Sequence, residues 1–565
     1  MTITYDFDAI VIGSGVTGGW AAKELTEKGL KVLMLERGKP LTHGKDYTTE
    51  HIEPWKIPFA GRPMRDLYAS DYPIQSSLYA FDETTRHFFN NDRENPYAYD
   101  PQKPFLWYRA DVVGGKSLLW GRQVYRWSDL DFEANKKDGH GNDWPIRYQD
   151  IKDWYSYVEK HIGVSGQAEN LPHLPDSEFL PPMEMYAIEK TFKQRVEANF
   201  AGRKVTIGRV ANLTQPIQDR GACHYCGPCQ RGCSVGAYFS SHSSTLPAAR
   251  RTNRFTLRAN SLVERLEYDP NKKRVSAVHV IDTQTKEKLR FTARIVFLCA
   301  STVGSLQILL NSKSENFPNG LANSSGTLGH YVMDHVDSTS AIGISTEFNN
   351  KYYFGNRPNS IYIPRFRNVS GQDSDVNFVR GYAFNAVPVP AEWRIAFSQI
   401  PGFGAEFKKA LRQPRFWIFV LQSFGECLPD KKNRVLLDEK LVDRFGIPQV
   451  RFDIEFGDNE KQMAADANKQ AAEMLKAAKM MAIPMNMMGV PGQAIHEMGG
   501  ARMGNDPGES VLNAHNQAHD IPNLFVTDGS AMASTSCVNP SLTFMALTAR
   551  AADYAVKQLK ARKIA

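Results

Sequence analysis

The sequence predicts an α/β protein whose N-terminal part is a doubly wound, nucleotide-binding domain. Residues 8–36 read as an apolar strand, a glycine turn, a helix and a second apolar strand that ends in an acidic residue. This order is typical of the βαβ unit of dinucleotide-binding folds. Two later segments, one around Cys299 and one that ends before Asp528, are also apolar strands. The unit at 8–36 is therefore expected to begin a doubly wound domain.

The glycine turn has the GxGxxG spacing, and each glycine has its own role. Gly13 permits the tight turn, Gly15 lets the backbone approach a pyrophosphate, and Gly18 lets the helix pack against the strand. The first N–H groups of the helix point at the diphosphate, and the acidic residue accepts hydrogen bonds from the ribose hydroxyls. The predicted contacts of this unit are Gly13, Gly15, Val16, Thr17, Gly18, Glu36 and Arg37.

This fingerprint does not distinguish FAD from NAD, because both cofactors use it. An ordinary glycine-rich turn is the plainer alternative. The segments HEMGGARMG and GTLGHY lack both the glycine spacing and a preceding apolar strand, so only one fingerprint is found in the sequence. The chain is therefore expected to bind one dinucleotide.

Bulk composition excludes several classes of protein. The chain has 565 residues, of which 42% are hydrophobic and 23% charged, and its net charge of +7 is mild for this length. No block of Lys and Arg predicts nucleic-acid binding, and no apolar run of about 18 residues predicts a transmembrane segment. The N-terminal residues MTITYDFDAI do not resemble a signal peptide.

Four of the seven cysteines lie within eleven residues, at Cys223, Cys226, Cys229 and Cys233. Their spacing matches the Cys-x2-Cys-x2-Cys-x3-Cys run of bacterial ferredoxins, although Ser234 stands where those proteins have proline. Zinc usually takes two ligand pairs separated by a dozen or more residues, and disulfides need an oxidising compartment. The run therefore predicts an iron–sulfur cluster. In two-cluster ferredoxins the fourth cysteine binds the other cluster, so both a three-iron and a four-iron cluster are open.

One dinucleotide together with an iron–sulfur cluster favours FAD over NAD. A flavin can pass single electrons onward, whereas a nicotinamide moves a hydride as a unit of two electrons. The cluster would then carry electrons away from the flavin.

Several motifs, taken in order, resemble the glucose-methanol-choline (GMC) oxidoreductases. The resemblance covers nearly the whole chain. Within the family, the chain most closely resembles the catalytic subunits of bacterial membrane-coupled sugar dehydrogenases and pyranose-oxidase-like enzymes. Its motifs are the N-terminal fingerprint, VVGGKSLLWG at 112–121, and the segments 144–166, 234–249, 296–312, 328–335, 495–504 and 526–555.

The resemblance implies a doubly wound FAD-binding domain of GMC type and an inserted substrate domain built on an antiparallel sheet. The whole chain would then be α+β. The expected FAD-binding domain comprises 1–48, 105–135, 221–335 and 490–565, and it carries the iron–sulfur loop 221–236. The expected substrate domain comprises 49–104, 136–220 and 336–489.

The resemblance also places VVGGKSLLWG beside the isoalloxazine ring, with contacts from Gly114, Gly115, Ser117 and Trp120. Pyranose oxidases have a histidine in this segment that bonds covalently to the flavin, and Leu119 occupies the matching position. Non-covalent FAD is therefore expected.

Oxidation of an alcohol by a flavin requires a base for the hydroxyl proton, and histidine suits this role. By resemblance, His496 is the base, six residues before Arg502, and Asn539 is the partner that hydrogen-bonds the substrate oxygen. A buried structural histidine is the alternative interpretation of His496. The remaining histidines, His335 among them, are expected to be structural.

The C-terminal block is expected to complete the flavin site. Asp528 and Gly529 follow an apolar strand and resemble a second flavin contact, near the ribityl chain. A helix begins after Pro540, and its positive end, which includes Ser541, would face the flavin. Asn539 is expected to cap this helix as well as to contact the substrate and the cofactor.

In related sugar dehydrogenases three cysteines with the spacing of Cys223, Cys229 and Cys233 bind a 3Fe-4S cluster, which is therefore favoured. A 4Fe-4S cluster is possible if Cys226 is also a ligand. The family implies a small helper subunit, which often bears the export signal, and a cytochrome c-type acceptor. Periplasmic residence by co-export is the leading expectation, and the cytoplasm is the alternative.

The expected substrate is a sugar or glycoside, oxidised at a secondary hydroxyl, with C3 of D-glucosides favoured. A gluconate 2-dehydrogenase or glucose 1-dehydrogenase catalytic subunit is one alternative. An oxygen-using, pyranose-oxidase-like enzyme is another, and an electron-transfer subunit without an alcohol site is a third.

Overall fold

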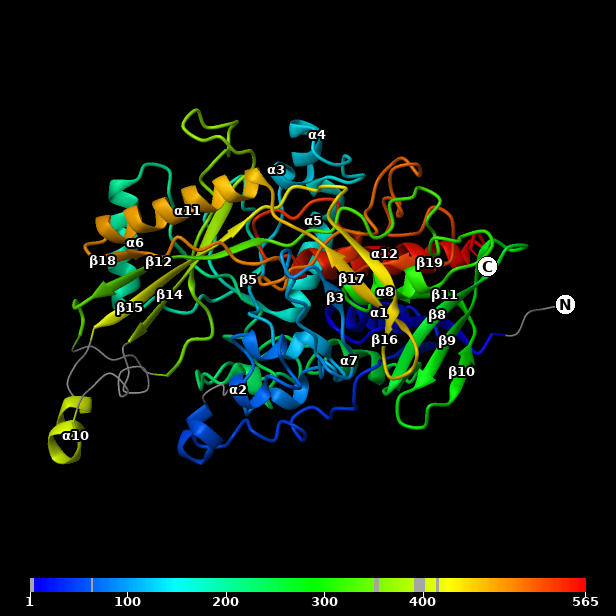
Figure 1. Cartoon of the computed structure of the whole chain (residues 1–565), viewed down its shortest axis with the longest axis horizontal. Helices are drawn as coiled ribbons and strands as arrows, with labels where there is room; N and C mark the ends of the chain where they lie inside the picture. The colour runs from blue at the N-terminus through cyan, green and yellow to red at the C-terminus, as the bar shows by residue number, and fades with distance from the viewer. Residues whose placement is uncertain (1–4, 62–64, 350–354, 391–401, 413–415, 565) are drawn as a thin grey trace.

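The computed structural model describes residues 5–61, 65–349, 355–390, 402–412 and 416–564 (Figure 1). Two sheets organise these residues. One is parallel and lies beside the N- and C-terminal helices, and the other is antiparallel and lies at the opposite end of the molecule (Figure 1).

The parallel sheet has five strands in the order β19-β11-β1-β2-β7. Its strands are β1 (Phe7–Ile12), β2 (Val32–Leu35), β7 (Phe255–Arg258), β11 (Ala293–Leu298) and β19 (Leu524–Val526). Alternate residues of β1 pack into different clusters, because Ile10 and Ile12 join one core and Ala9 and Val11 join another. Both faces of the sheet are therefore buried, as parallel sheets require.

Helices cover both faces of this sheet. The longest of them is α12 (Ser541–Lys560), which packs against α1 (Val16–Glu27) and α5 (Tyr148–Ile162). Further helices of this region are α7 (Thr245–Arg251) and α8 (Thr302–Asn311). A small antiparallel sheet of β8 (Ser261–Asp269), β9 (Arg274–Asp282) and β10 (Lys288–Phe291) lies between β7 and β11 in the chain.

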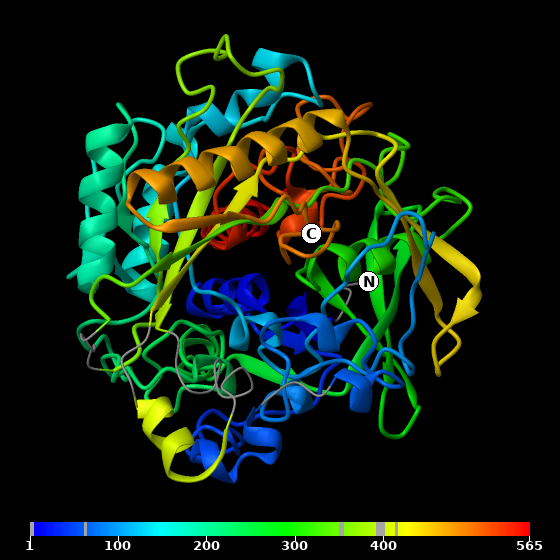
Figure 2. The ribbon, with the colours of Figure 1, turned by 60° about the vertical axis from the view of Figure 1, so that its left-hand side comes forward.

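The six-stranded antiparallel sheet has the order β18-β12-β15-β14-β13-β6. Its strands are β6 (Thr206–Ile207), β12 (Val336–Ser345), β13 (Ile361–Ile363), β14 (Tyr382–Pro390), β15 (Trp417–Gly425) and β18 (Met481–Pro484). Its outer face packs on α11 (Asp458–Ala477) and α6 (Ala187–Asn199), as Figure 2 shows. Along β14, Phe384 and Ala386 face this core, whereas Asn385 and Val387 face a cavity.

Shorter elements complete the described chain. They are α2 (Arg65–Tyr68), α3 (Asp129–Phe132), α4 (Ala134–Asp138), α10 (Gly404–Arg412), β3 (Ala98–Tyr99), β4 (Val164–Ser165), β5 (Phe179–Leu180), β16 (Arg434–Val442), β17 (Pro448–Asp453) and several 3-10 turns. Among the described helices, none is both long and apolar enough to cross a membrane.

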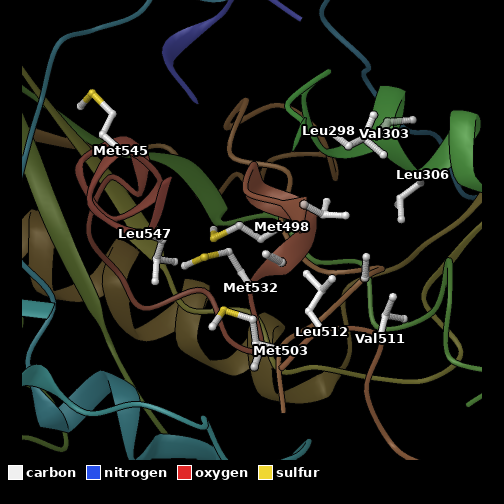
Figure 3. Packing of buried hydrophobic residues seen from close by; sticks show 14 of the residues in the cluster. Leu298, Val303, Leu306, Met498, Met503, Val511, Leu512, Met532, Met545 and Leu547 are labelled. Atoms are coloured by element: carbon white, nitrogen blue, oxygen red, sulfur yellow. The ribbon is translucent and has the colours of Figure 1, made fainter. Parts of the chain in front are cut away.

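The C-terminal block packs into the core beside α8. Figure 3 shows Met498, Met503 and Met532 with Leu512 and Leu306 in one buried cluster. The thioether side chains fill the irregular space between the loops of residues 498–532 and the parallel sheet. The segment that carries His496 is thus fixed at one end to this core.

The predicted fold class is confirmed, with a parallel α/β core and a separate antiparallel sheet. Strands of the parallel sheet come from 1–48, 221–335 and 490–565, and those of the six-stranded sheet from 136–220 and 336–489. The exact domain bounds stay a prediction.

Candidate active site

One cavity of about 670 Å³ lies between the two sheets. It is lined by most of the residues predicted to bind the cofactor and substrate, namely Gly13, Gly15, Val16, Thr17, Glu36, Arg37, Gly115, Ser117, Trp120, His496, Asp528, Gly529, Asn539 and Ser541. Two predicted residues, Gly18 and Gly114, pack behind this lining and shape the backbone. Segments that are far apart in the sequence therefore form one site.

The glycine turn between β1 and α1 has the close packing that the fingerprint predicts. Gly13 has φ 99°, and a Cβ atom there would lie 2.3 Å from the carbonyl oxygen of Cys299. A Cβ atom on Gly18 would lie 1.9 Å from the carbonyl oxygen of Gly13. At Gly15 a Cβ atom would meet nothing within 4 Å, because this residue faces the cavity. The turn thus leaves space for a diphosphate at the N-terminus of α1.

Glu36, at the end of β2, is held rigidly at the edge of the cavity. One carboxylate oxygen accepts hydrogen bonds from the backbone N–H of Ser14 (3.0 Å) and from its hydroxyl (2.5 Å). The other accepts from the backbone N–H of Gly38 (2.8 Å). Burial raises the pKa of Glu36. This carboxyl is oriented to meet the ribose hydroxyls of a dinucleotide.

The predicted flavin segment follows a positive-φ residue, Gly114, and forms a 3-10 turn over Gly115–Leu118. The N–H of Gly114 donates to the Ser14 hydroxyl oxygen (2.8 Å), which ties this segment to the glycine turn. The Trp120 indole N–H donates to the carbonyl oxygen of Phe239 (3.0 Å). Leu119 is buried and lines the cavity. The segment therefore presents an apolar wall suited to a planar ring.

Asp528 caps the 3-10 turn Gly529–Ala531 at the end of β19. Its carboxylate accepts from the backbone N–H (3.0 Å) and hydroxyl (2.6 Å) of Ser530. A Cβ atom on Gly529 would lie 2.4 Å from the carbonyl oxygen of Glu497. This close approach brings the Asp528 turn beside the segment that carries His496.

His496 lies at the wall of the cavity with partners on both ring nitrogens. Its Nε2 is 3.3 Å from Nδ2 of Asn539, and its Nδ1 is 2.9 Å from Nδ1 of His335. Desolvation first, and then His335 and the Lys116 ammonium, lower the pKa of His496 well below its usual range. The ring is therefore neutral and can accept a proton at neutral pH. The predicted pair of His496 and Asn539 is thus brought together.

The backbone around His496 is fixed by Asp334. The Asp334 carboxylate accepts from the backbone N–H groups of Gly492 (2.8 Å), Ala494 (3.2 Å) and His496 (3.0 Å). Burial, followed by the nearby Glu497 carboxylate, raises the pKa of Asp334 to about 8. The preceding residue, Ile495, has φ 64°, which is rare for a β-branched side chain. Strained backbone of this kind is typical of functional sites.

The structure adds a polar group that sequence reasoning missed, formed by Asp337 of β12, Gln422 of β15 and Asn385 of β14. We call these three residues the polar ledge, and all of them line the cavity. Asp337 Oδ1 accepts from Gln422 Nε2 at 2.7 Å, and Gln422 is paired with Asn385 across the sheet. The Oδ1 atom of Asn385 is buried and has no hydrogen-bond partner among the described residues. An unpaired acceptor at a cavity wall is suited to a ligand hydroxyl.

Asn539 does not cap the C-terminal helix, so that expectation was wrong. Helix α12 begins at Ser541, Pro540 is its N-cap residue, and no side chain makes a capping hydrogen bond there. Proline has no side-chain hydrogen-bonding group, so it cannot make a capping hydrogen bond itself. The Asn539 amide is therefore available to His496 and to a substrate.

The four clustered cysteines lie in one loop beside the cavity, and Cys229 is part of the cavity wall. Cys226 is exposed, and the other three are partly buried. Burial, followed by the neighbouring Cys229, Cys226 and Cys233 thiols, raises the pKa of Cys223 to about 11. Within the described residues, however, no three or more His, Cys, Asp or Glu side chains are arranged to hold a metal ion. The thiols are chemically suitable ligands, and the iron–sulfur cluster stays a prediction.

Two family profiles, both described as GMC oxidoreductase, match residues 7–337 and 429–548. The chain is 29% identical to 2-methyl-1,2-propanediol dehydrogenase of Mycolicibacterium austroafricanum, over 97% of this chain and 94% of that protein. It is 26% identical to the fructose dehydrogenase large subunit of Gluconobacter japonicus, over 99% of each chain. It is 25% identical to the gluconate 2-dehydrogenase flavoprotein of Pantoea cypripedii, over 96% of this chain and 92% of that one.

Solved structures show the same fold at low identity. Formate oxidase of Aspergillus oryzae superposes with a TM-score of 0.62 and 13% identity, covering 100% of both chains. Pyridoxine 4-oxidase from Mesorbium loti superposes with a TM-score of 0.58 and 15% identity, covering 97% of this chain and 98% of that one. Because the family profiles span most of its length and these flavoenzymes share its fold, the chain belongs to the GMC oxidoreductase family and uses FAD.

Proposed function

We propose that the chain is an FAD-dependent dehydrogenase that oxidises a secondary hydroxyl of a sugar or glycoside, with C3 of D-glucosides favoured. The observation that carries this proposal is the contact between His496 and Asn539 at the wall of the cavity that the glycine turn opens into. Similarity to the fructose and gluconate dehydrogenase chains supports a sugar substrate.

The geometry supports the following roles. FAD, when bound along the glycine turn and the Gly114–Trp120 segment, supplies the acceptor for the hydride that leaves the substrate carbon. His496 Nε2 accepts the proton of the reacting hydroxyl. The Asn539 amide donates a hydrogen bond to the same oxygen and so stabilises its developing negative charge. The neutral state of His496 is what allows it to act as the base.

The polar ledge supports a substrate with several hydroxyl groups. The Phe424 ring lies 5.7 Å from the His496 ring, centre to centre. Gln422 is two residues away from Phe424 along β15, which corresponds to a rise of about 7 Å. Because His496 and the polar ledge line the same cavity, a second hydroxyl of a polyhydroxylated substrate has polar partners in the site. The chain's similarity to a propanediol dehydrogenase makes a small diol the second candidate substrate.

Product analysis tests the substrate assignment. The holoenzyme would be incubated with D-glucosides, glucose, gluconate, lactose, trehalose and a small 1,2-diol, each with an artificial electron acceptor, and the products examined by NMR. The proposal predicts 3-keto sugars. Oxidation only at C2 of gluconate or C1 of glucose would identify one of the alternative dehydrogenases, and oxidation of 1,2-diols alone would reject a sugar substrate.

We further propose that electrons leave through an iron–sulfur cluster held by Cys223, Cys229 and Cys233 to a cytochrome c-type acceptor. A 3Fe-4S cluster is favoured. If Cys226 is a fourth ligand, the cluster would be 4Fe-4S. The cysteine spacing and the position of Cys229 in the cavity wall support this proposal. Iron analysis and EPR of anaerobically purified protein test it. Absence of iron together with rapid peroxide formation would instead favour an oxygen-using oxidase.

The same proposal includes a small helper subunit and periplasmic residence by co-export, with the cytoplasm as the alternative. One relative is itself named as a large subunit, which supports a second chain. Fractionation of cells that express the chain with and without its neighbouring genes tests both points. Release of the chain with the periplasmic fraction in the absence of any partner would contradict co-export.

A further inference from the structure

We propose that His335 is a positioning residue that fixes the tautomer of His496, so that His496 carries its proton on Nδ1 and leaves Nε2 free. The inference deepens the proposed function, because it rests on His496 acting as the base. It assigns a role to a histidine that sequence reasoning treated as structural.

The hydrogen-bond partners of His335 determine its own tautomer. Its Nε2 lies 3.1 Å from the carbonyl oxygen of Thr535, and a carbonyl oxygen can only accept. His335 Nε2 must therefore carry the proton. A neutral imidazole has one N–H, so Nδ1 of His335 is left with a lone pair.

That lone pair determines the tautomer of His496. The two Nδ1 atoms are 2.9 Å apart, and two lone pairs at this distance would repel each other. His496 Nδ1 must therefore donate its proton to His335. His496 Nε2 is then unprotonated, and it faces the Asn539 amide nitrogen, which donates. The chain of donors runs from Asn539 through both histidines to the Thr535 carbonyl.

This series of hydrogen bonds requires both imidazole rings to be neutral. His335 is 1% exposed, and burial lowers its pKa to about 4. The ionisable groups near the pair are already engaged: Lys116 pairs with Glu497 at 2.9 Å, and the Asp334 carboxyl group accepts backbone N–H groups. None of these carboxylates is hydrogen-bonded to either ring in the described structure.

Two adjacent residues thus hold His496 at different points. Asp334 binds its backbone N–H, and His335 binds its ring. The Phe424 ring lies near both histidines, at 6.3 Å from His335 and 5.7 Å from His496. An imidazole without such partners populates both tautomers, and the one with the proton on Nε2 cannot act as the base.

Substitution of His335 tests the inference. His335→Phe keeps an aromatic ring but removes the acceptor, whereas His335→Asn can place Oδ1 near the position of the lost Nδ1. We expect His335→Phe to slow flavin reduction by substrate on the order of 10²-fold with little change in KM. We expect His335→Asn to recover most of that rate. FAD content and the melting temperature of each variant control for misfolding.

The tautomer itself can be measured on the unmodified holoenzyme, without substrate. In protein labelled with ¹⁵N-histidine, the His496 signals, assigned by their loss in His496→Ala, should show protonation at Nδ1. Protonation at Nε2 would overturn the inference even if both His335 variants fail to fold. So would a flavin reduction rate in His335→Phe within about twofold of the parent rate. If the tautomer is as expected but no sugar is oxidised, the substrate assignment fails and the positioning role stands.

Discussion

Replacement of Asp337 by asparagine should stabilise the protein at alkaline pH while impairing its activity. Burial raises the pKa of Asp337 to about 6, from the ordinary aspartate value of 3.8, despite hydrogen bonds from Gln422 and Gln493. Since the pKa is higher in the folded state, ionisation of Asp337 destabilises the fold. Each tenfold change in proton affinity corresponds to ~1.4 kcal/mol, so this destabilisation is ~3 kcal/mol above pH 6.

The pH window of this effect follows from the same two pKa values. Below about pH 4 the carboxyl is protonated in both the folded and unfolded states, and the substitution should have no pH-linked effect on stability. Between about pH 4 and pH 6 the penalty in the parent grows, because the carboxyl ionises in the unfolded chain while the folded state keeps it protonated; above that range the carboxyl is ionised in both states and the penalty is constant. Asp153 of α5 is exposed, so its substitution by asparagine removes a carboxyl without removing a buried charge and serves as the control.

The assay is urea unfolding of Asp337→Asn, Asp153→Asn and the parent at pH 4 and pH 8. We expect Asp337→Asn to gain up to ~3 kcal/mol at pH 8 relative to pH 4, and Asp153→Asn to gain none. At pH 8 Asp337→Asn should also lose on the order of 10-fold or more in kcat/KM, because a charged acceptor on the ledge is removed. Equal stability changes at both pH values would refute the burial argument.

Three further variants and one chemical test address the remaining parts of the site. His496→Ala should lose on the order of 10²- to 10⁴-fold in kcat while retaining FAD, measured by its visible spectrum; near-normal turnover would reject His496 as the base. Cys229→Ser should slow electron transfer to the acceptor more than flavin reduction by substrate, and equal loss in both half-reactions would argue against a relay. Gly18→Ala should lower FAD content, because its Cβ atom would lie 1.9 Å from the carbonyl oxygen of Gly13, and full FAD content at unchanged melting temperature would contradict this. Acid precipitation should release the flavin from the polypeptide, whereas flavin retained in the pellet would show a covalent bond.

The parts of the site that the sequence predicted are those built from local backbone. The glycine turn, its strand and its helix lie within 8–36, so spacing alone specifies how Gly13, Gly15 and Gly18 pack. The assignments of His496 and Asn539 came from motif resemblance, and the structure places the two side chains in contact.

The parts that the sequence did not predict depend on how distant strands align. Asp337, Gln422 and Asn385 meet only because β12, β15 and β14 are neighbours in a particular register. Their signal in the sequence was a polar residue on the cavity-facing side of a strand, and which side faces the cavity is known only once the register is known. His335 was missed for a similar reason, since its partner is 161 residues away.

One expectation came from a sequence pattern that the structure contradicts, and another stays a prediction. The capping role of Asn539 relied on the asparagine's position before a helix, but Pro540 occupies the cap. The cluster was predicted from cysteine spacing, and spacing describes the loop but not the directions of its side chains. Neighbouring thiols of this loop raise the pKa of Cys223, but within the described residues no three candidate ligands are arranged around one metal ion, so the cluster stays a prediction.

The placement of the polar ledge has a consequence for how this enzyme could acquire new substrates. Asp334, His335 and Asp337 are almost consecutive, so changes on β12 that alter substrate preference also disturb the residues that hold the base. Asn385 lies on β14, two strands away from β12, and none of its hydrogen bonds in the described structure reaches His496. Directed evolution of specificity should therefore begin at Asn385, because substitutions there can change which substrate is preferred without disturbing the residues that position His496.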